Sequence, residues 1–326
     1  MIKDSKTVIN LSIVGAGKIS DRSLAPAIAA TPGAQLWSVY SRDACRARAF
    51  AERHGAASSH AAFTSIEDLL SDPKLDAVVI ATPDRLHAEH AICAAQAGKH
   101  VFLEKPMTHD VKSAQAVVQA CHKADVRLGV AYHLRWHAGH RALIRKIRDG
   151  ALGPLRHVHA TWTLRAEKDD NWRARDEVGR WWSLARTGTH LIDLARWALL
   201  PSEGEVTEVR SLITRSVWNG PHDETAIVLL LFASGASAEL VSSVAFDSIG
   251  RFEIYGAAKN AICEGTLGPS GRGDISIGGE PLQYTAQDPY IGEMRDFVAA
   301  VRDYREPEVS GAEGLRNIEI LANACP

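Results

Sequence analysis

Residues 7–20, TVINLSIVGAGKIS, are the stretch that decides the fold. An apolar, β-branched run, typical of a buried parallel strand, leads into G-x-G-x-x-S and then a helix-like segment. The first glycine, Gly15, permits a tight turn, and Gly17 lets backbone approach a pyrophosphate at the helix start, beside Lys18 and Ile19. The third position is Ser rather than Gly or Ala. The stretch predicts a dinucleotide-binding turn, with a plain strand–helix turn as the alternative.

Strand-like and helix-like segments alternate after this turn. Helices are expected at 43–54, 84–97 and 108–124, with buried strands at 75–82 and 126–133. Residues 65–68, SIED, have the form of a capping box and predict a short helix that begins at Ser65. Repeated strand–helix units predict a doubly wound parallel sheet covered on both faces. We therefore assign residues 1–128 to a dinucleotide-binding domain. Ligands bind at the carboxyl edge of such a sheet.

The second half of the chain, residues 129–326, is predicted to consist mainly of strands instead of alternating strands and helices. After a helix at 138–149, strands are expected, and many alternate apolar and polar residues, as in an antiparallel sheet with one covered face. The expected strands are 155–164, 205–217, 225–232, 236–245, 251–256 and 260–266. One helix interrupts them at 189–200, and a last helix is expected at 290–304. This half is assigned to an α+β domain with a large, open, mostly antiparallel sheet that binds substrate and forms oligomers.

The end of the second strand indicates which dinucleotide is bound. This strand is expected at 35–40, and Ser41 and Arg42 follow it, where an NAD site usually has an acidic residue for the ribose 2′-hydroxyl. A guanidinium can pair bidentately with a 2′-phosphate, so the pair favours NADP, with NAD as the alternative. Asp43 is expected to begin the next helix. Arg42 as a solvated turn residue is the competing interpretation.

Residues 95–110, AQAGKHVFLEKPMTHD, place Glu104 and Lys105 at the carboxyl edge of the sheet. A lysine there can act as a general acid or base or donate to a substrate oxygen, although most lysines are simply solvated. Thr82 ends the preceding strand, Pro83 follows it, and both are candidate cofactor contacts. His87 and His90 come next on a helix, and without an evident third ligand they are interpreted as helix or cofactor-edge residues rather than a metal site.

Residues 171–186, NWRARDEVGRWWSLAR, form a loop rich in Trp and Arg. The tryptophans that could stack on a sugar ring are Trp172, Trp181 and Trp182, and the arginines that could hold hydroxyls or a carboxylate are Arg173, Arg175, Arg180 and Arg186. The alternative is that the tryptophans are core and the arginines solvated. Next, His190 and Asp193 lie three residues apart and share a helix face, an arrangement that suits proton transfer. Such a pair is also common as a structural hydrogen bond.

Composition narrows the functional classes. The 326 residues suggest about two domains, and a net charge of −2 without a Lys/Arg block disfavours nucleic acid as a partner. The five cysteines are scattered, which indicates reduced thiols and a cytoplasmic protein. A charged-then-apolar leader and an apolar run of membrane-spanning length are both lacking in the sequence, so no membrane association is expected.

These motifs, taken in order, resemble the Gfo/Idh/MocA family of NAD(P)-dependent oxidoreductases. The likeness rests on GAGKIS (15–20), ATP (81–83) with His87, AGKHVFLEKP (97–106), YHLRW (132–136), WR (172–173), GTHLID (188–193), DET (223–225) and EIYG (253–256). It implies a Rossmann domain joined to an α+β domain whose open sheet often forms an oligomer interface. It also implies hydride transfer at a sugar, polyol or related hydroxy or keto compound. The family's catalytic Lys and His fall on Lys105 and His190, and its substrate-contacting Asp on Asp193.

One position departs from the family pattern. Many members have an Asp four residues before the catalytic His, and this chain has Arg186 there. A cation at that position would lower the pKa of a nearby His190 and could bind an anionic substrate. The expected activity is therefore an NADP(H)-preferring dehydrogenase or reductase of carbohydrate-like compounds, in a homodimer or homotetramer. The alternatives are a catalytically weak NAD(P)-binding sensor or structural protein, and an NAD-dependent glycosidase of the same family.

Overall fold

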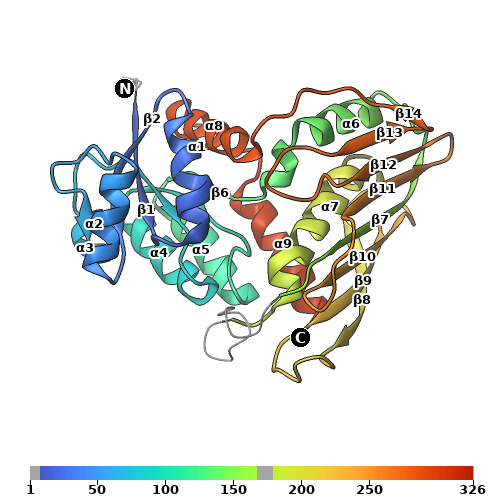
Figure 1. Ribbon diagram of the computed structural model, residues 1–326, viewed down its shortest axis with the longest axis horizontal. Coiled ribbons are helices and arrows are strands. Elements are labelled where there is room, and N and C mark those ends of the chain that lie inside the picture. The colour runs from blue at the N-terminus through green and yellow to red at the C-terminus, as the bar shows by residue number, and fades with distance from the viewer. Residues whose placement is uncertain (1–7, 167–178, 326) are drawn as a thin grey trace. The chain divides into compact units, whose positions relative to one another are not determined.

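The computed structural model describes residues 8–166 and 179–325 (Figure 1). The chain forms two compact units, each of which is discontinuous in sequence. The first unit comprises residues 1–131 and 290–318, and the second comprises residues 132–289 and 319–326.

A six-stranded parallel sheet forms the centre of the first unit, in the order β3-β2-β1-β4-β5-β6. Its strands are β1 (Ile9–Val14), β2 (Ala34–Tyr40), β3 (Ala62–Phe63), β4 (Ala77–Ile80), β5 (His100–Leu103) and β6 (Leu128–Val130). The strand order reverses direction between β1 and β4, and this switch point is where doubly wound sheets bind their ligands. The prediction of a doubly wound parallel sheet is confirmed.

Short helices connect these strands. They are η1 (Ser20–Leu24), α1 (Ala25–Ala29), α2 (Ala44–Arg53), α3 (Ile66–Leu70), η2 (Asp84–Leu86), α4 (His87–Gln96) and α5 (Val111–Lys123). Side-chain caps fix where three of them begin, because a carboxylate or hydroxyl accepts from otherwise unpaired amides. Asp43 caps α2, Ser65 caps α3 and Asp110 caps α5. The expected helix starts at Asp43 and Ser65 are confirmed.

The second unit contains an eight-stranded sheet in the order β14-β13-β12-β11-β7-β10-β9-β8. Its strands are β7 (Leu155–Thr163), β8 (Val206–Thr214), β9 (Thr225–Phe232), β10 (Ser237–Ser243), β11 (Arg251–Gly256), β12 (Asn260–Glu264), β13 (Asp274–Ile277) and β14 (Glu280–Pro281). All neighbouring pairs are antiparallel except β7 and β10. The open, mostly antiparallel sheet is thus confirmed. The strands β13 and β14, which end one side of the sheet, were not predicted, because they are only four and two residues long.

Among the described residues of the second unit, helical segments precede or interrupt the strands. They are η3 (His133–Trp136), α6 (Ala138–Arg148), η5 (Leu184–Gly188) and α7 (Thr189–Glu203). Figure 1 shows α6 and α7 on the same side of the sheet. The expected strand at 126–133 is shorter than predicted, because the chain leaves the sheet after β6 and turns into η3.

The two units do not follow the single boundary predicted between residues 128 and 129. Helix α8 (Pro289–Arg302) belongs to the first unit, whereas α9 (Gly311–Ala324) contributes to both. Five residues at helical spacing bury their side chains in the core of the first sheet: Tyr290, Met294, Phe297, Val298 and Val301. The rings of Phe297 and Phe102 on β5 lie 5.0 Å apart. A late segment returns to the first unit because its apolar face covers that sheet.

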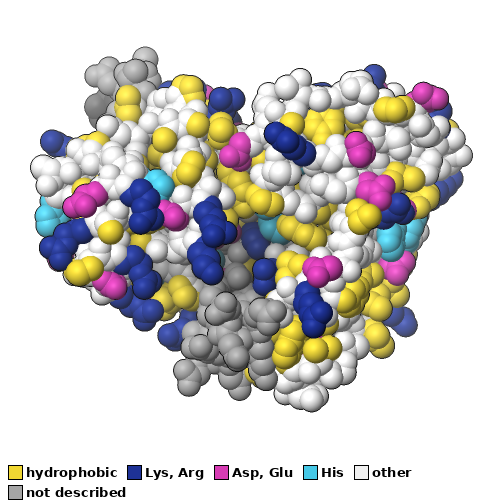
Figure 2. All heavy atoms as spheres, in the orientation of Figure 1, with side chains coloured by type: hydrophobic (Ala, Val, Ile, Leu, Met, Phe, Trp, Pro, Cys, Tyr) yellow, Lys and Arg dark blue, Asp and Glu magenta, His cyan; other side chains and the backbone are white. Residues whose placement is uncertain are grey.

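On the face drawn in Figure 2, acidic, basic and neutral side chains are interspersed over both units. Within residues 8–166 and 179–325, no helix has the length and apolar character that crossing a membrane requires.

Candidate functional site

The glycine turn follows β1 at the switch point of the first sheet. Gly15 has a φ of +112°, and a Cβ there would lie 2.8 Å from the Ala81 carbonyl oxygen. A Cβ on Gly17 would meet no atom within 4 Å. Ser20, at the unusual third position of the motif, is buried and donates its hydroxyl to the Gly15 carbonyl at 2.6 Å. The Ser20 side chain thus links the turn to the first helical residues. A glycine at this position would instead allow the helix to pack closely against the strand.

This geometry fits the pyrophosphate of a dinucleotide. The space beside Gly17 leaves its backbone approachable, and the exposed Lys18 and half-buried Ile19 lead directly into η1. Amides at the start of a helix point outward and favour a bound anion. The first glycine has a different task, because it allows the chain to pass against the end of β4.

The end of β2 carries the residues predicted to select the dinucleotide. Ser41 is buried and Arg42 is exposed. The Asp43 carboxylate accepts from the backbone amides of Arg46 at 3.0 Å and Cys45 at 2.9 Å. Those amides, that of Arg46 above all, hold the pKa of the Asp43 carboxyl below its usual value. Asp43 therefore serves as a helix cap, which leaves Ser41 and Arg42 as the first side chains beyond the strand.

Lys105 lies directly after β5, in the turn that begins with Glu104. Glu104 is buried, and its carboxylate accepts from the Lys105 amide at 3.1 Å, whereas Lys105 itself is half-buried. Thr82 and Pro83 follow β4, the neighbouring strand in the sheet. The first unit therefore brings the glycine turn, Thr82, Pro83 and Lys105 to the carboxyl ends of three adjacent strands.

His87 does not extend toward solvent from this edge. It is 1% exposed, with Nδ1 3.0 Å from the Pro106 carbonyl and Nε2 2.8 Å from the Thr82 carbonyl. His90, one turn later, lies 3.2 Å from the Thr82 hydroxyl through Nδ1, and burial lowers the pKa of its imidazole. The structure thus places the predicted cofactor-edge residue His87 between two turns of the backbone.

His190 lies in the first turn of α7 in the second unit. Its imidazole is 2% exposed and adjoins three aromatic rings of the same unit. The ring centroids lie 4.8 Å from His133, 5.4 Å from Trp162 and 5.8 Å from Tyr132. Trp162 is the half-exposed member of this group, and its indole is tilted by 40° to the imidazole. The cluster combines a group that can carry a proton with an apolar ring surface.

Asp193 forms a buried ion pair. Its two carboxylate oxygens accept from Arg135 Nε at 2.8 Å and from an Arg135 terminal nitrogen at 2.6 Å. Both side chains are almost fully buried. Removing one partner of such a pair typically costs about 3–5 kcal/mol, because the other charge is left buried. Asp193, predicted to contact substrate, is thus engaged in fastening η3 to α7.

Of the Trp/Arg loop at 171–186, the structure describes residues 179–186. Trp172 and Arg173 lie outside the described residues, as does the rest of 167–178. Trp181 and Trp182 are 1% exposed, and Trp182 packs against Trp218 with 4.9 Å between ring centroids. For these two residues, the alternative interpretation of tryptophan as core is correct. Arg186 lies half-buried in η5, one turn before His190.

Asp223 anchors the start of the segment that carries Arg186 and His190. Its carboxylate accepts from the Trp182 amide at 2.8 Å, the Ser183 hydroxyl at 2.6 Å and the Leu184 amide at 2.7 Å. Burial raises the pKa of this carboxyl, although these hydrogen bonds act in the opposite direction. The sequence offered Asp223 only as part of a family motif, without a role.

Sequence reasoning also missed Trp162, Arg135 and His133 as neighbours of the predicted residues. The alternation along β7 does place Trp162 on the same face as the buried Val158 and Ala160. Nothing local in the sequence shows that α7 packs over that face. A buried arginine such as Arg135 is equally hard to anticipate, because its partner lies 58 positions away.

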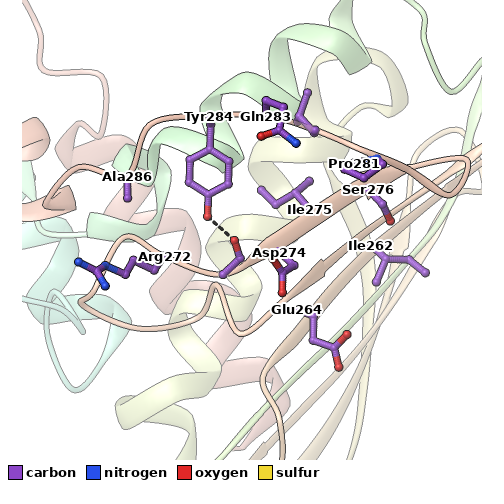
Figure 3. A pocket seen from close by; sticks show the side chains of 12 residues that line it. Ile262, Glu264, Arg272, Asp274, Ile275, Ser276, Pro281, Gln283, Tyr284 and Ala286 are labelled. Atoms are coloured by element: carbon purple, nitrogen blue, oxygen red, sulfur yellow. Dashed lines mark hydrogen bonds between the residues drawn. The ribbon is translucent and has the colours of Figure 1, made fainter.

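A surface hollow of about 470 Å³ lies elsewhere in the second unit, at the β12–β13 edge of the sheet (Figure 3). Glu264, Asp274 and Ser276 line it. At its margin, the Tyr284 hydroxyl donates to the Gly273 carbonyl at 2.6 Å. It contains none of the residues predicted to act on substrate or cofactor. Within the described parts of the chain, no group of three or more His, Cys, Asp or Glu is arranged to hold a metal.

Comparison with known proteins decides the family. Residues 9–132 match a model of an oxidoreductase family with an NAD-binding Rossmann fold, and residues 140–262 match the GFO/IDH/MocA C-terminal domain. The chain is 30% identical to 1,5-anhydro-D-fructose reductase of Ensifer adhaerens over 315 residues, covering 93% of this chain and 91% of the relative. The chain belongs to the Gfo/Idh/MocA family. It is an NAD(P)-dependent oxidoreductase, as the resemblance implied.

Two further likenesses concern other members of the family. Myo-inositol 2-dehydrogenase of Thermotoga maritima is 26% identical over 264 residues, covering 78% of this chain and 77% of the relative. The solved structure of aldose-aldose oxidoreductase from Caulobacter crescentus has a TM-score of 0.89 at 24% identity, covering 97% of this chain and 96% of that one. The latter supports the fold alone.

The two glycines of the turn should respond differently to alanine. Gly15→Ala places a Cβ 2.8 Å from a backbone carbonyl at a positive φ, so it should lower the thermal midpoint and abolish dinucleotide binding. Gly17→Ala adds a methyl group where no protein atom lies within 4 Å, so folding should be retained. Its dissociation constant for the dinucleotide should still rise about tenfold, because the methyl group occupies space needed by the pyrophosphate.

Thermal unfolding and fluorescence titration with NADPH and NADH measure both effects. Gly98→Ala, at another positive-φ turn with open space around it, is the control for backbone strain without a contact. Unchanged dinucleotide affinity in the Gly17→Ala variant would contradict the placement of the pyrophosphate.

Proposed function

We propose that the protein is an NADP(H)-preferring dehydrogenase or reductase of a sugar, polyol or sugar-acid-like hydroxy or keto compound. The observation that carries this proposal is the position of Lys105, directly after β5 and beside the turn that follows β4. That is the edge where a doubly wound sheet binds its ligand. The names of the two relatives, a reductase of an anhydro-sugar and a dehydrogenase of an inositol, support the carbohydrate-like substrate class.

The dinucleotide, when bound, supplies or accepts the hydride. In the oxidative direction, His190 takes the hydroxyl proton while the Lys105 ammonium donates to the reacting oxygen, or Lys105 itself takes that proton as a neutral amine. In the reductive direction, the same groups return the proton to the oxygen that forms. A positioned general acid–base contributes about 10²–10⁴-fold to such a step. The residues proposed to hold the dinucleotide are Gly15, Gly17, Lys18, Ile19, Ser41, Arg42, Thr82, Pro83 and Glu104.

Substrate recognition is assigned to the surroundings of His190. Trp162 presents a half-exposed indole next to the imidazole, which suits the apolar face of a sugar or polyol ring. Arg186, one turn earlier, supplies a cation that would favour an anionic group on the substrate. Trp172 and Arg173 remain predicted substrate contacts. Asp193 contributes indirectly in this proposal, because its carboxylate is engaged with Arg135.

Lys105→Ala should reduce turnover about 100-fold or more while changing the dissociation constant for the dinucleotide less than threefold. The assay follows the nicotinamide absorbance band with 1,5-anhydro-D-fructose, inositols, aldoses and sugar acids as candidate substrates. Lys112→Ala, an exposed lysine on α5, is the matched control and should retain full activity. Wild-type turnover that survives in Lys105→Ala would remove this residue from the mechanism.

The same assay separates the competing functions. Tight dinucleotide binding without turnover of any tested compound would favour the sensor, which the substitution of Arg186 for the usual carboxylate motivates. Dinucleotide retained through purification, together with hydrolysis of glycosides, would favour the glycosidase.

Arg42→Ala should raise the dissociation constant of NADPH about 10–100-fold and leave that of NADH within threefold. Loss of a charge-assisted pair with the 2′-phosphate accounts for this difference, since such a bond contributes about 1.5–3 kcal/mol. Arg46→Ala, an exposed arginine one turn into α2, should change neither constant. Equal weakening of both dinucleotides in Arg42→Ala would speak against the assignment of NADP.

We also propose that the second unit's sheet forms a homodimer or homotetramer. On one face, β8 and β9 present three exposed leucines: Leu212 at 60%, Leu229 at 48% and Leu231 at 40%. Cross-strand pairing places Leu212 opposite Ile227 on the same face. A contiguous apolar strip of this kind is a typical interface feature.

Sedimentation velocity tests the assembly. The wild type should exceed the 35.3 kDa of a single chain, and Leu229→Asp should shift it toward that mass. Val8→Asp, at an exposed valine of the first unit, should leave the assembly unchanged. A monomeric wild type at micromolar concentration would refute this interface.

A further inference from the structure

His87 is placed to hold two backbone turns together. It is the first residue of α4, and its side chain folds back toward Thr82, five residues earlier. Its two ring nitrogens lie 2.8 Å from the Thr82 carbonyl and 3.0 Å from the Pro106 carbonyl, 19 residues later. The side chain is 1% exposed. The imidazole therefore connects the turn after β4 with the turn that contains Lys105.

The two turns belong to neighbouring strands. β4 and β5 pair in parallel from Ala77↔His100 to Ile80↔Leu103, so their carboxyl ends leave the sheet at the same edge. A flat ring with nitrogens on opposite sides can reach one carbonyl on each turn. Because both partners are carbonyl oxygens that only accept, the imidazolium hydrogen-bonds both turns, whereas a neutral imidazole donates to one of them. Neither an amide nor a hydroxyl side chain has donors spaced in this way.

We propose that His87 is a positioning residue for Lys105. By holding the Pro106 carbonyl to the turn after β4, it fixes the backbone from which the Lys105 side chain extends. This replaces the role of cofactor contact that the sequence predicted for His87. The inference rests on the proposed function of Lys105 in handling the reacting oxygen and proton.

Small displacements of a reacting group have large kinetic effects. A shift of about 1 Å can cost about 100-fold in rate. His87→Gln retains at most one of the two contacts, so the hydride-transfer rate should fall about 10–100-fold. The dissociation constant for the dinucleotide should change much less than the rate, because the glycine turn, Ser41 and Arg42 are untouched and only the contact to the Thr82 carbonyl is altered on the cofactor side.

A double-mutant cycle separates positioning from general structural damage. Single-turnover hydride transfer is measured for His87→Gln, Lys105→Ala and the combined variant, with the best substrate from the panel. If His87 acts through Lys105, the combined variant should be about as slow as Lys105→Ala alone. Losses that multiply would overturn the proposal, as would an undiminished rate in His87→Gln.

His100→Gln is the matched control. This histidine lies at the opposite end of β5, where its Nδ1 accepts from the Arg127 amide at 2.9 Å. The same chemical change there should leave the rate within threefold of the wild type. If His87→Gln fails to fold, His87→Asn serves in the same cycle, with thermal unfolding as the check on each variant.

A second measurement does not depend on turnover. Lysines are reductively methylated with ¹³C-formaldehyde, and the Lys105 signal is assigned by its loss in Lys105→Arg. His87→Gln should displace the Lys105 methyl signal, and His100→Gln should not. An unmoved signal would overturn the role of His87 even if Lys105 proves catalytic. A displaced signal in a protein that turns over none of the substrates would refute the proposed function and leave the positioning intact.

Discussion

The close passage of the glycine turn against β4 is the constraint on which the first unit depends. At Gly15 the chain lies so near the Ala81 carbonyl that even a methyl group would not fit. The ends of β1 and β4 can therefore stay adjacent while their connections leave on opposite sides. The dinucleotide motif, Thr82 and Lys105 all follow strands that end at this edge. The close contact at Gly15, which keeps these strand ends adjacent, therefore places the three near one another. The helices and caps of the unit then fix each turn in place.

Buried polar contacts organise the second unit in a different way. Arg135 and Asp193 pair bidentately, and Asp223 accepts three hydrogen bonds where the η5–α7 segment begins. Each carboxylate is costly to bury alone and stable only with its partners. Together they set the register of the segment that carries Arg186 and His190. Gly188 allows this segment to approach β10, since a Cβ there would lie 2.9 Å from the Ser242 hydroxyl.

Several residues first interpreted as ligand contacts are thus parts of the scaffold. Asp193 fastens two helical segments, His87 connects two turns, and Trp181 and Trp182 fill the core. Functional motifs contain such residues because a site needs its first contacts held rigidly. The replacement of the usual carboxylate by Arg186 changes the charge one turn before His190. In the proposed function, Lys105 takes a larger share of the proton and oxygen handling, and Arg186 is proposed to bind a negatively charged group of the substrate.

The local sequence pattern was sufficient to predict the alternation of strands and helices, the glycine turn, and the helix caps at Asp43 and Ser65. It was also sufficient to identify the family. These features depend on neighbouring residues, whose periodicity and hydrogen bonding are read within a few positions. Contacts between distant residues were decided only by the tertiary structure. The packing of α8 on the first sheet, the pairing of Arg135 with Asp193, and the placement of Trp162 beside His190 each join segments far apart in the chain. The physical reason is that burial and ion pairing depend on which surfaces meet, and a linear pattern does not specify that.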